Sequence, residues 1–235
     1  MKHLCLMFFL CIFYTQSFCQ KNYSEFVIDC ELEMVYIQGG TFNYGDGEYD
    51  NITGERHLRE VTVPSFYMAK YETTQKLWET VMGYNPSFFK GKDLPVENVS
   101  WNEVNNFITK LNQLTGKQYC LPTAEEWEYV AKEGVSEDWK LYSGSNNIDE
   151  VGWYVDNSEK KTHSVGQKKP NAFGIYDMTG NVWEYHSNYE GGFKGGSWHC
   201  SKENSEITYN GRTHPDNNNF DYIGFRLILY TEKCN

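Results

Sequence analysis

The sequence lacks the features that mark several large classes of protein. It has no run of basic residues, and 32 Asp and Glu stand against 21 Lys and Arg. A chain of this charge has no stretch that could neutralise a phosphate backbone, so we expect no nucleic-acid partner. It also has no HExxH zinc motif and no Ser, His and Asp at a recognisable triad spacing, which gives hydrolysis little support. Repeats and low complexity are absent apart from the short "DNNNF" at 216–220.

No apolar run is long enough to cross a membrane. The longest, Leu4–Tyr14, is about half of the roughly 20 residues that a membrane-spanning helix needs. It follows Lys2 and precedes small residues near Cys19, which is the pattern of a secretory signal peptide. We therefore expect residues 1–19 to be removed and the protein to be secreted, periplasmic or on the cell surface, with no membrane span. Lipidation at Cys19 is a minor alternative, because Phe18 stands where a small residue is usual.

Length and composition indicate one large domain after this leader. About 216 of the 235 residues remain, which suffices for a single sizeable core. Aromatic residues make up 17% of the chain and are scattered, as in a loop-rich fold held by large rings. We expect a single monomeric domain over residues 28–232.

Helix-end signals predict three helices. The segments "SWNE" at 100–103 and "TAEE" at 123–126 have the capping-box spacing, a hydroxyl residue followed three positions later by Glu. Gly116 and Gly134 are the expected helix ends. Apolar residues at helical spacing predict a third, weaker helix over 74–82.

Strand-like segments lie near both ends of the domain. They occupy 34–42, 61–72 and 223–230. Residues 135–222 are rich in Gly, Asn, Ser and aromatics without any period. That much irregular chain in a compact domain indicates a functional surface or a bound ion.

Six ordered segments carry a family resemblance. They are "MVYIQGGTF", "FYMAKYETTQKLWETVMGYNPS", "LPVENVSWNEVNNFITKLNQLTGKQYCLPTAEEWEYVAKEG", "PNAFGIYDMTGNVWEY", "KGGSW" and "IGFRL". Together they resemble the successive blocks of the formylglycine-generating enzyme (sulfatase-modifying factor) family over roughly residues 32–230. The resemblance implies an α+β fold, a loop-rich variant of the C-type-lectin-like fold.

The resemblance also implies a chemistry, in which one residue of this chain departs from the family. Enzymes of the family oxidise a cysteine of a sulfatase peptide to formylglycine with oxygen and a Cu(I) ion held between two thiolates. Cys200 matches the first of these cysteines, but Ser205 stands at the second. Because Cu(I) prefers thiolates and a hydroxyl is a hard ligand, copper is not expected here. His199 is a poor substitute if the chain is extended, since neighbouring side chains then point to opposite faces.

Two residues of this segment keep alternative interpretations. By resemblance Ser197 lines the active site together with Cys200. A serine after two glycines is equally typical of a turn residue that bonds its own backbone. Without catalysis, Cys200 would be a half-buried thiol or a disulfide partner.

A calcium site is implied at "GIYDMTGNVWEY". Residues that match the family's ligands are the side chains of Asp177 and Glu184 and the carbonyls of Gly180 and Val182. Two carboxylates and nearby carbonyls supply the hard oxygens that calcium prefers, so calcium is the expected cofactor. The alternative is that Glu184 accepts hydrogen bonds from loop amides and Asp177 caps a turn.

Four cysteines follow the leader. We expect Cys120 in the core and, with Cys200, reduced. Cys30 lies just before the first expected strand and Cys234 just after the last. In the fold that the resemblance implies, the terminal strands lie side by side and antiparallel, which predicts a disulfide between Cys30 and Cys234.

Three functions remain open from the sequence. The missing second cysteine favours a binding or scaffold module that takes a peptide, protein or glycan on the loop surface of residues 185–222. The first alternative is an active oxidase that converts a sulfatase cysteine to formylglycine. The second is a hypervariable lectin-like receptor, which the asparagines of 216–220 suggest.

Overall fold

The structure is a computed structural model that describes residues 21–45, 58–135, 140–188, 192–212 and 220–231. The expected signal peptide, residues 1–19, lies outside the described residues. So do Cys234 and most of "DNNNF". Among the described residues, no helix has the length and apolar character that a membrane crossing requires.

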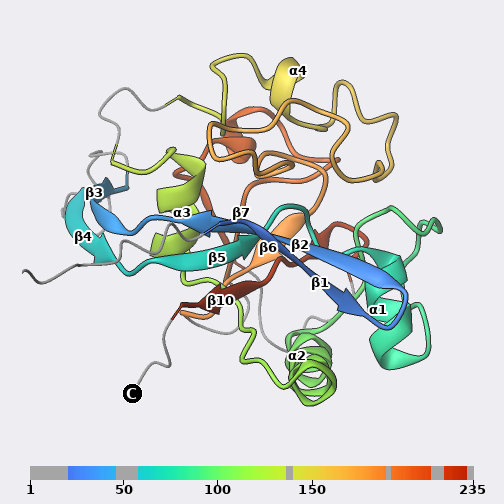
Figure 1. Cartoon of the computed structure of the whole chain (residues 1–235). Helices are drawn as coiled ribbons and strands as arrows, with labels where there is room; N and C mark the ends of the chain where they lie inside the picture. Colours follow the sequence, from blue (N-terminus) through green and yellow to red (C-terminus); the bar gives the residue numbers. More distant parts are fainter. Residues whose placement is uncertain (1–20, 46–57, 136–139, 189–191, 213–219, 232–235) are drawn as a thin grey trace, which may run out of the picture.

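The described chain forms one α+β domain with three small sheets. The largest has the strand order β1-β2-β5-β10, β3 pairs with β4, and the third has the order β8-β7-β6-β9. In the view of Figure 1, α2 lies below the largest sheet, and α4 with the long loops lies above it. The strands are β1 (Tyr23–Val27), β2 (Cys30–Ile37), β3 (Gly40–Tyr44), β4 (Arg59–Val63), β5 (Phe66–Ala69), β6 (Trp183–Tyr185), β7 (Gly192–Lys194), β8 (Asn210–Arg212), β9 (Ile223–Gly224) and β10 (Ile228–Tyr230). The helices are α1 (Gln75–Met82), α2 (Trp101–Thr115), α3 (Ala124–Ala131) and α4 (Ile148–Val151).

The three predicted helices are confirmed. Both capping boxes are complete, at the start of α2 and at the start of α3. Gly116 ends α2 in the left-handed conformation, as expected. By contrast α3 ends at Ala131, and the N–H of Gly134 then donates to the Tyr129 carbonyl at 2.8 Å. The starts of α2 and α3 and the end of α2 form as predicted, because each depends only on residues within one or two turns.

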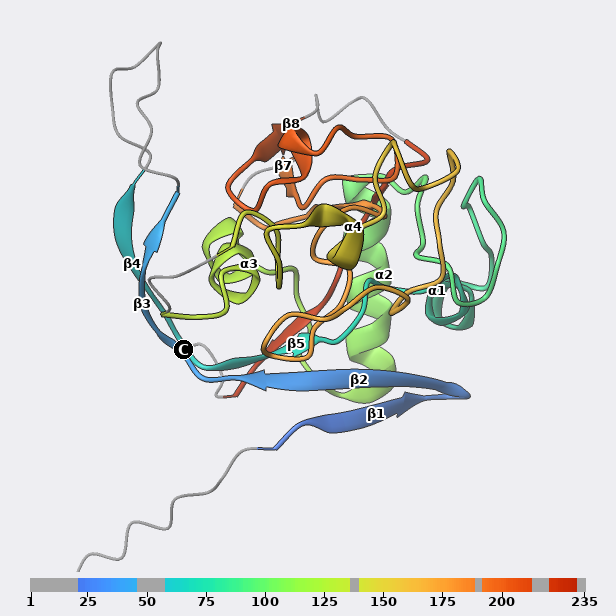
Figure 2. The same ribbon diagram turned by 90° about the horizontal axis from the view of Figure 1, so that it is seen from above.

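Each of the three predicted strands is interrupted, which corrects the sequence prediction. The segment 34–42 divides into β2 and β3, and 61–72 divides into β4 and β5. The two bends face each other, because the Gly39 N–H donates to Ser65 Oγ at 3.0 Å. A side chain at Gly39 would lie 2.4 Å from the Pro64 carbonyl carbon, so the close approach requires glycine. Seen from above in Figure 2, β3 and β4 leave the large sheet together.

The predicted pairing of the terminal strands is wrong, and with it the reason for a disulfide between Cys30 and Cys234. β5 lies between β2 and β10. Tyr230 pairs with Phe66, which pairs with Ile37 at the far end of β2. Cys30 starts β2 and therefore lies about 23 Å along the strand from Ile37. Cys234 lies outside the described residues, so the disulfide stays a prediction without this support.

Large aromatic residues fill the main core between α1, α2 and the sheets. Trp78 is fully buried and stacks on Phe107 with ring centroids 5.1 Å apart. Phe225 packs edge-on against both rings. This cluster also contains Cys200, so the turn that carries the candidate site is anchored directly on the core.

Candidate functional site

The segment after β7 forms a tight turn rather than an extended strand. Gly195 and Gly196 have φ angles of 99° and 79°, a region that favours glycine. A Cβ atom on Gly196 would lie 2.3 Å from Ser205 Oγ, so only glycine fits against this residue. The Cys200 N–H then donates to the Ser197 carbonyl at 3.0 Å and closes the turn.

The turn gathers two polar side chains, His199 and Cys200, around Ser197. Its Oγ lies 3.1 Å from Cys200 Sγ and 2.9 Å from His199 Nδ1. The prediction that His199 points away is wrong, because the turn brings its ring back to Ser197. Ser197 is fully buried and lies beside Cys200. This position agrees with the first of its two interpretations.

The Cys200 thiol is buried and held in its protonated form. It is 7% exposed, so it is buried more fully than the half-buried thiol that the sequence suggested. Burial raises the pKa of Cys200, although the contact with Ser197 opposes the shift. Burial also lowers the pKa of His199. Near pH 7 the pair is therefore a neutral thiol and a neutral imidazole, which is the opposite of an activated thiolate–imidazolium pair.

Ser205 occupies a closed environment of its own. Its side chain is fully buried, and its hydroxyl donates to the Ser201 carbonyl at 3.0 Å. The other described cysteines lie elsewhere: Cys30 Sγ contacts Thr80 Oγ1 of α1 at 3.1 Å, and half-buried Cys120 packs beside Ile228 of β10. The described residues thus offer one thiol at this turn and no second one.

Glu184, an expected calcium ligand, is the partner of a buried arginine. Arg226 donates from Nη2 to Oε1 at 2.5 Å and from Nε to Oε2 at 2.6 Å. The indole N–H of Trp127 donates to Oε2 at 2.7 Å. All three side chains are nearly or completely buried. Glu184 thus accepts side-chain donors, not the loop amides of the alternative interpretation.

Asp177, the second expected calcium side chain, holds a neighbouring loop. It is buried at a φ of 56°, and its Oδ2 accepts the Gly166 N–H at 2.6 Å. Gly180 lies against the Trp153 backbone so closely that a side chain would collide with it. Within the described part of the chain, no three His, Cys, Asp or Glu side chains converge in a way that could hold a metal ion.

Sequence reasoning missed Glu72, which lies in the same buried group. Its carboxylate accepts the Asn181 Nδ2–H at 2.6 Å and the Val182 N–H at 3.1 Å. Burial, with Asp177 and Glu184 nearby, raises the pKa of Glu72 well above its usual value. Burial also raises the pKa of Asp177 to about 6. Glu72 and Arg226 both stand in the segments that carried the family resemblance, which was the only signal for them.

Six rings from three loops form an aromatic surface beside Cys200. Phe88 packs edge-on against Phe89, and Phe89 packs against Trp198 at 5.6 Å. The surface continues through His199 to Tyr222 at 4.2 Å and ends at Phe220, which stacks on Tyr222 at 4.9 Å. Phe88 is 68% exposed. We call these residues the aromatic surface: Phe88, Phe89, Trp198, His199, Phe220 and Tyr222.

Known proteins resemble this chain over most of its length. The family "Sulfatase-modifying factor enzyme 1-like domain" matches residues 28–230. "Chaperone protein LppX" of Paenibacillus barcinonensis is 35% identical, with 77% of this chain and 83% of that protein covered. "Inactive C-alpha-formylglycine-generating enzyme 2" of Bos taurus is 25% identical, with 83% and 87% covered.

Solved structures agree with the fold. "Treponema denticola variable protein 1" superposes with a TM-score of 0.80 at 26% identity and covers 89% of this chain and 99% of its own. PvdO from Pseudomonas aeruginosa has a TM-score of 0.75 at 21% identity, with 90% and 99% covered. The observed α+β fold is therefore the fold of these proteins. Together with the match over residues 28–230, this shows that the chain belongs to the sulfatase-modifying factor enzyme 1-like domain family.

Proposed function

We propose that this protein is a binding member of the family that lacks the copper-dependent oxidase activity. The observation that carries the proposal is Ser205, a buried hydroxyl bonded to the Ser201 carbonyl at the position of the second cysteine. The residues do not fit Cu(I), because one buried, protonated thiol and a hydroxyl do not make the paired thiolates that this soft ion prefers.

The aromatic surface is the proposed ligand site. It combines two exposed rings, Phe88 and His199, with four half-buried rings that are fixed by packing. Rigid aromatic side chains contribute much of the energy of protein and peptide recognition because they bury large areas at low entropic cost. The relative named as a chaperone and the relative named as inactive both support a non-enzymatic role. We therefore infer an extended peptide or protein ligand.

Binding to peptide and glycan arrays, followed by titration of the best peptide, tests this site. Phe88→Ala is expected to weaken binding about tenfold, the effect of about 1.4 kcal/mol. The matched control is Phe26→Ala, because Phe26 is 69% exposed but lies on β1. Equal affinities of both variants and the parent would refute the aromatic surface, and binding to glycans alone would refute the peptide class.

An aldehyde assay tests the loss of oxidase activity. Purified protein loaded with copper is incubated with a sulfatase-motif peptide that contains cysteine. No aldehyde is expected. Aldehyde formation that Cys200→Ala abolishes would show instead that the protein is a one-cysteine oxidase.

Calcium at Asp177, Glu184 and the carbonyls of Gly180 and Val182 is a separate proposal. Asp177 and Glu184 are buried close enough to Arg226 to raise its pKa, and carboxylate and carbonyl oxygens are the ligands that calcium prefers. Glu184 would have to share its oxygens with Arg226. The role of the ion would be to brace the loops, so chelation is the test.

The hypervariable receptor is retained because of the likeness to the Treponema denticola variable protein. Identical sequences over residues 195–222 in many isolates would refute it. Export is also proposed, from the leader pattern of residues 1–19. Amino-terminal sequencing of protein recovered outside the cytoplasm tests export and cleavage after Cys19.

A further inference from the structure

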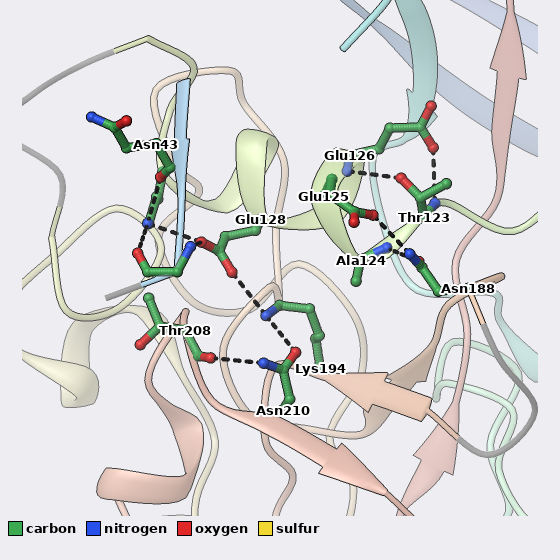
Figure 3. A network of polar contacts seen from close by, with 12 residues as sticks. Asn43, Thr123, Ala124, Glu125, Glu126, Glu128, Asn188, Lys194, Thr208 and Asn210 are labelled. Carbon is green, nitrogen blue, oxygen red and sulfur yellow. Dashed lines mark hydrogen bonds and ion pairs between the residues drawn. The ribbon is translucent and has the colours of Figure 1, made fainter. Parts of the chain in front are cut away.

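A lysine, a glutamate and an asparagine meet at the third sheet. Lys194 ends β7, and Asn210 begins β8 directly opposite it in the antiparallel register. Lys194 Nζ lies 3.0 Å from Asn210 Oδ1 and 2.9 Å from Oε2 of Glu128 on α3. Figure 3 shows the amino group between the carboxylate and the amide.

The charges of this group leave Lys194 as the side chain best placed to lose its proton. Glu128 is fully buried and pairs with two buried lysines, Lys194 and Lys132. The Lys132 amino group also donates to the carbonyls of Asn43 and Gly45. The two buried ammonium groups repel each other across the shared carboxylate, and a buried charge is costly. Burial lowers the pKa of Lys194, with a smaller contribution from Lys132 and against the opposing effect of Glu128.

Apolar rings and a second hydrogen bond complete the arrangement. The Lys194 amino group lies 5.5 Å from the Tyr44 ring centre and 5.7 Å from that of Trp127. The Asn210 Nδ2–H donates to the Thr208 carbonyl at 3.3 Å, which keeps Oδ1 toward Lys194 (Figure 3). A buried amine is thereby held against an amide carbonyl, with a carboxylate in contact to carry protons.

We propose that Lys194 and Asn210 join in an intramolecular isopeptide bond, with Glu128 as the proton carrier. The neutral Lys194 amine attacks Cγ of Asn210, and the carbonyl electron pair moves to Oδ1. Glu128 takes a proton from Nζ and returns it to Nδ2, after which the Cγ–Nδ2 bond breaks and ammonia leaves. The products are a secondary amide and ammonia. No atom changes oxidation state, so no oxidant or other co-reactant is needed.

The bond would fix the frame of the candidate site. Residues 195–209 between the linked strands include the turn of Ser197 and Cys200 and the buried Ser205. β7 and β8 are short, three residues each. A covalent link between β7 and β8 would hold residues 195–209 in place even when the few hydrogen bonds between these strands open.

Peptide mass spectrometry of the purified full chain tests the proposal. Trypsin does not cut at an acylated lysine, so the expected product is a branched peptide that joins Lys194 to Asn210 of fragment 203–212. Its mass is lower by one ammonia, about 17 Da, than the sum of the two separate peptides. Lys132 is an internal control, because it touches the same carboxylate and donates to the backbone carbonyls of Asn43 and Gly45. Normal cleavage after Lys132 is therefore expected.

Asn210→Ala removes the electrophile at an exposed position, so the fold is expected to persist while the branched peptide disappears. Glu128→Gln that still folds is expected to leave Lys194 and Asn210 unlinked. Normal cleavage at Lys194 in the parent protein would overturn the proposal. A loss of ammonia without the branched peptide would do the same, since Asn210 followed by Gly211 can lose ammonia by closing on its own backbone.

Discussion

Glu97→Gln is expected to make the protein more stable above pH 7 and to leave its stability near pH 4.5 almost unchanged. Glu97 is buried, and its Oε1 accepts the Phe89 N–H at 2.9 Å. Among the described groups its Oε2 has no hydrogen-bond partner. Burial, reinforced by nearby Asp221, raises the pKa of Glu97 to about 7, against the opposing backbone hydrogen bonds.

The sign of the effect follows from this raised pKa. Between about pH 4.5 and pH 7 the folded protein binds a proton at Glu97 that the unfolded chain has released. The unfolding free energy therefore falls as the pH rises through this window. The difference of about 2.5 pH units corresponds to at most about 3 kcal/mol, and screening by solvent reduces it to roughly 1–2 kcal/mol. Glutamine mimics the neutral acid and removes the dependence.

Urea unfolding of the parent and of Glu97→Gln between pH 4.5 and 8.5 measures the effect. The two unfolding free energies are expected to agree at the acid end and to separate by roughly 1–2 kcal/mol above pH 7. Glu79→Gln is the control, because it removes the same charge at an exposed position on α1. Parallel curves for the parent and Glu97→Gln would refute a neutral, buried Glu97.

Four further measurements follow from the structure. Cys200 is expected to react with iodoacetamide far more slowly in the native protein than in urea, and equal rates would show that the thiol is open. Ser205→Cys is expected to gain Cu(I) affinity in a copper titration, while the parent is expected to bind no more Cu(I) than a Cys200→Ala control. Excess chelator is expected to lower the melting temperature, and an unchanged melting curve would count against the calcium site. Trp78→Ala is expected to lower the unfolding free energy by about 3–5 kcal/mol, because a fully buried ring stacked on Phe107 is removed. A loss below about 1 kcal/mol would contradict this account of the core.

Local residues were enough to predict the helices and the family segments. Ser100 with Glu103 and Thr123 with Glu126 form complete capping boxes, because both partners of each box lie within one helical turn. The α+β fold and the departure at Ser205 came instead from the resemblance to the family, which the ordered segments carry.

Only the tertiary structure decided what depends on residues far apart in the chain. β5 between β2 and β10 removes the basis for a disulfide of Cys30, and no spacing in the sequence shows that strand order. The turn after Gly196 brings His199 to Ser197. Ser205 packs in the space that a side chain at residue 196 would need. Arg226 reaches Glu184 across 42 positions of the chain. Such contacts are set by packing and by the cost of burying unpaired charge, which local patterns do not encode.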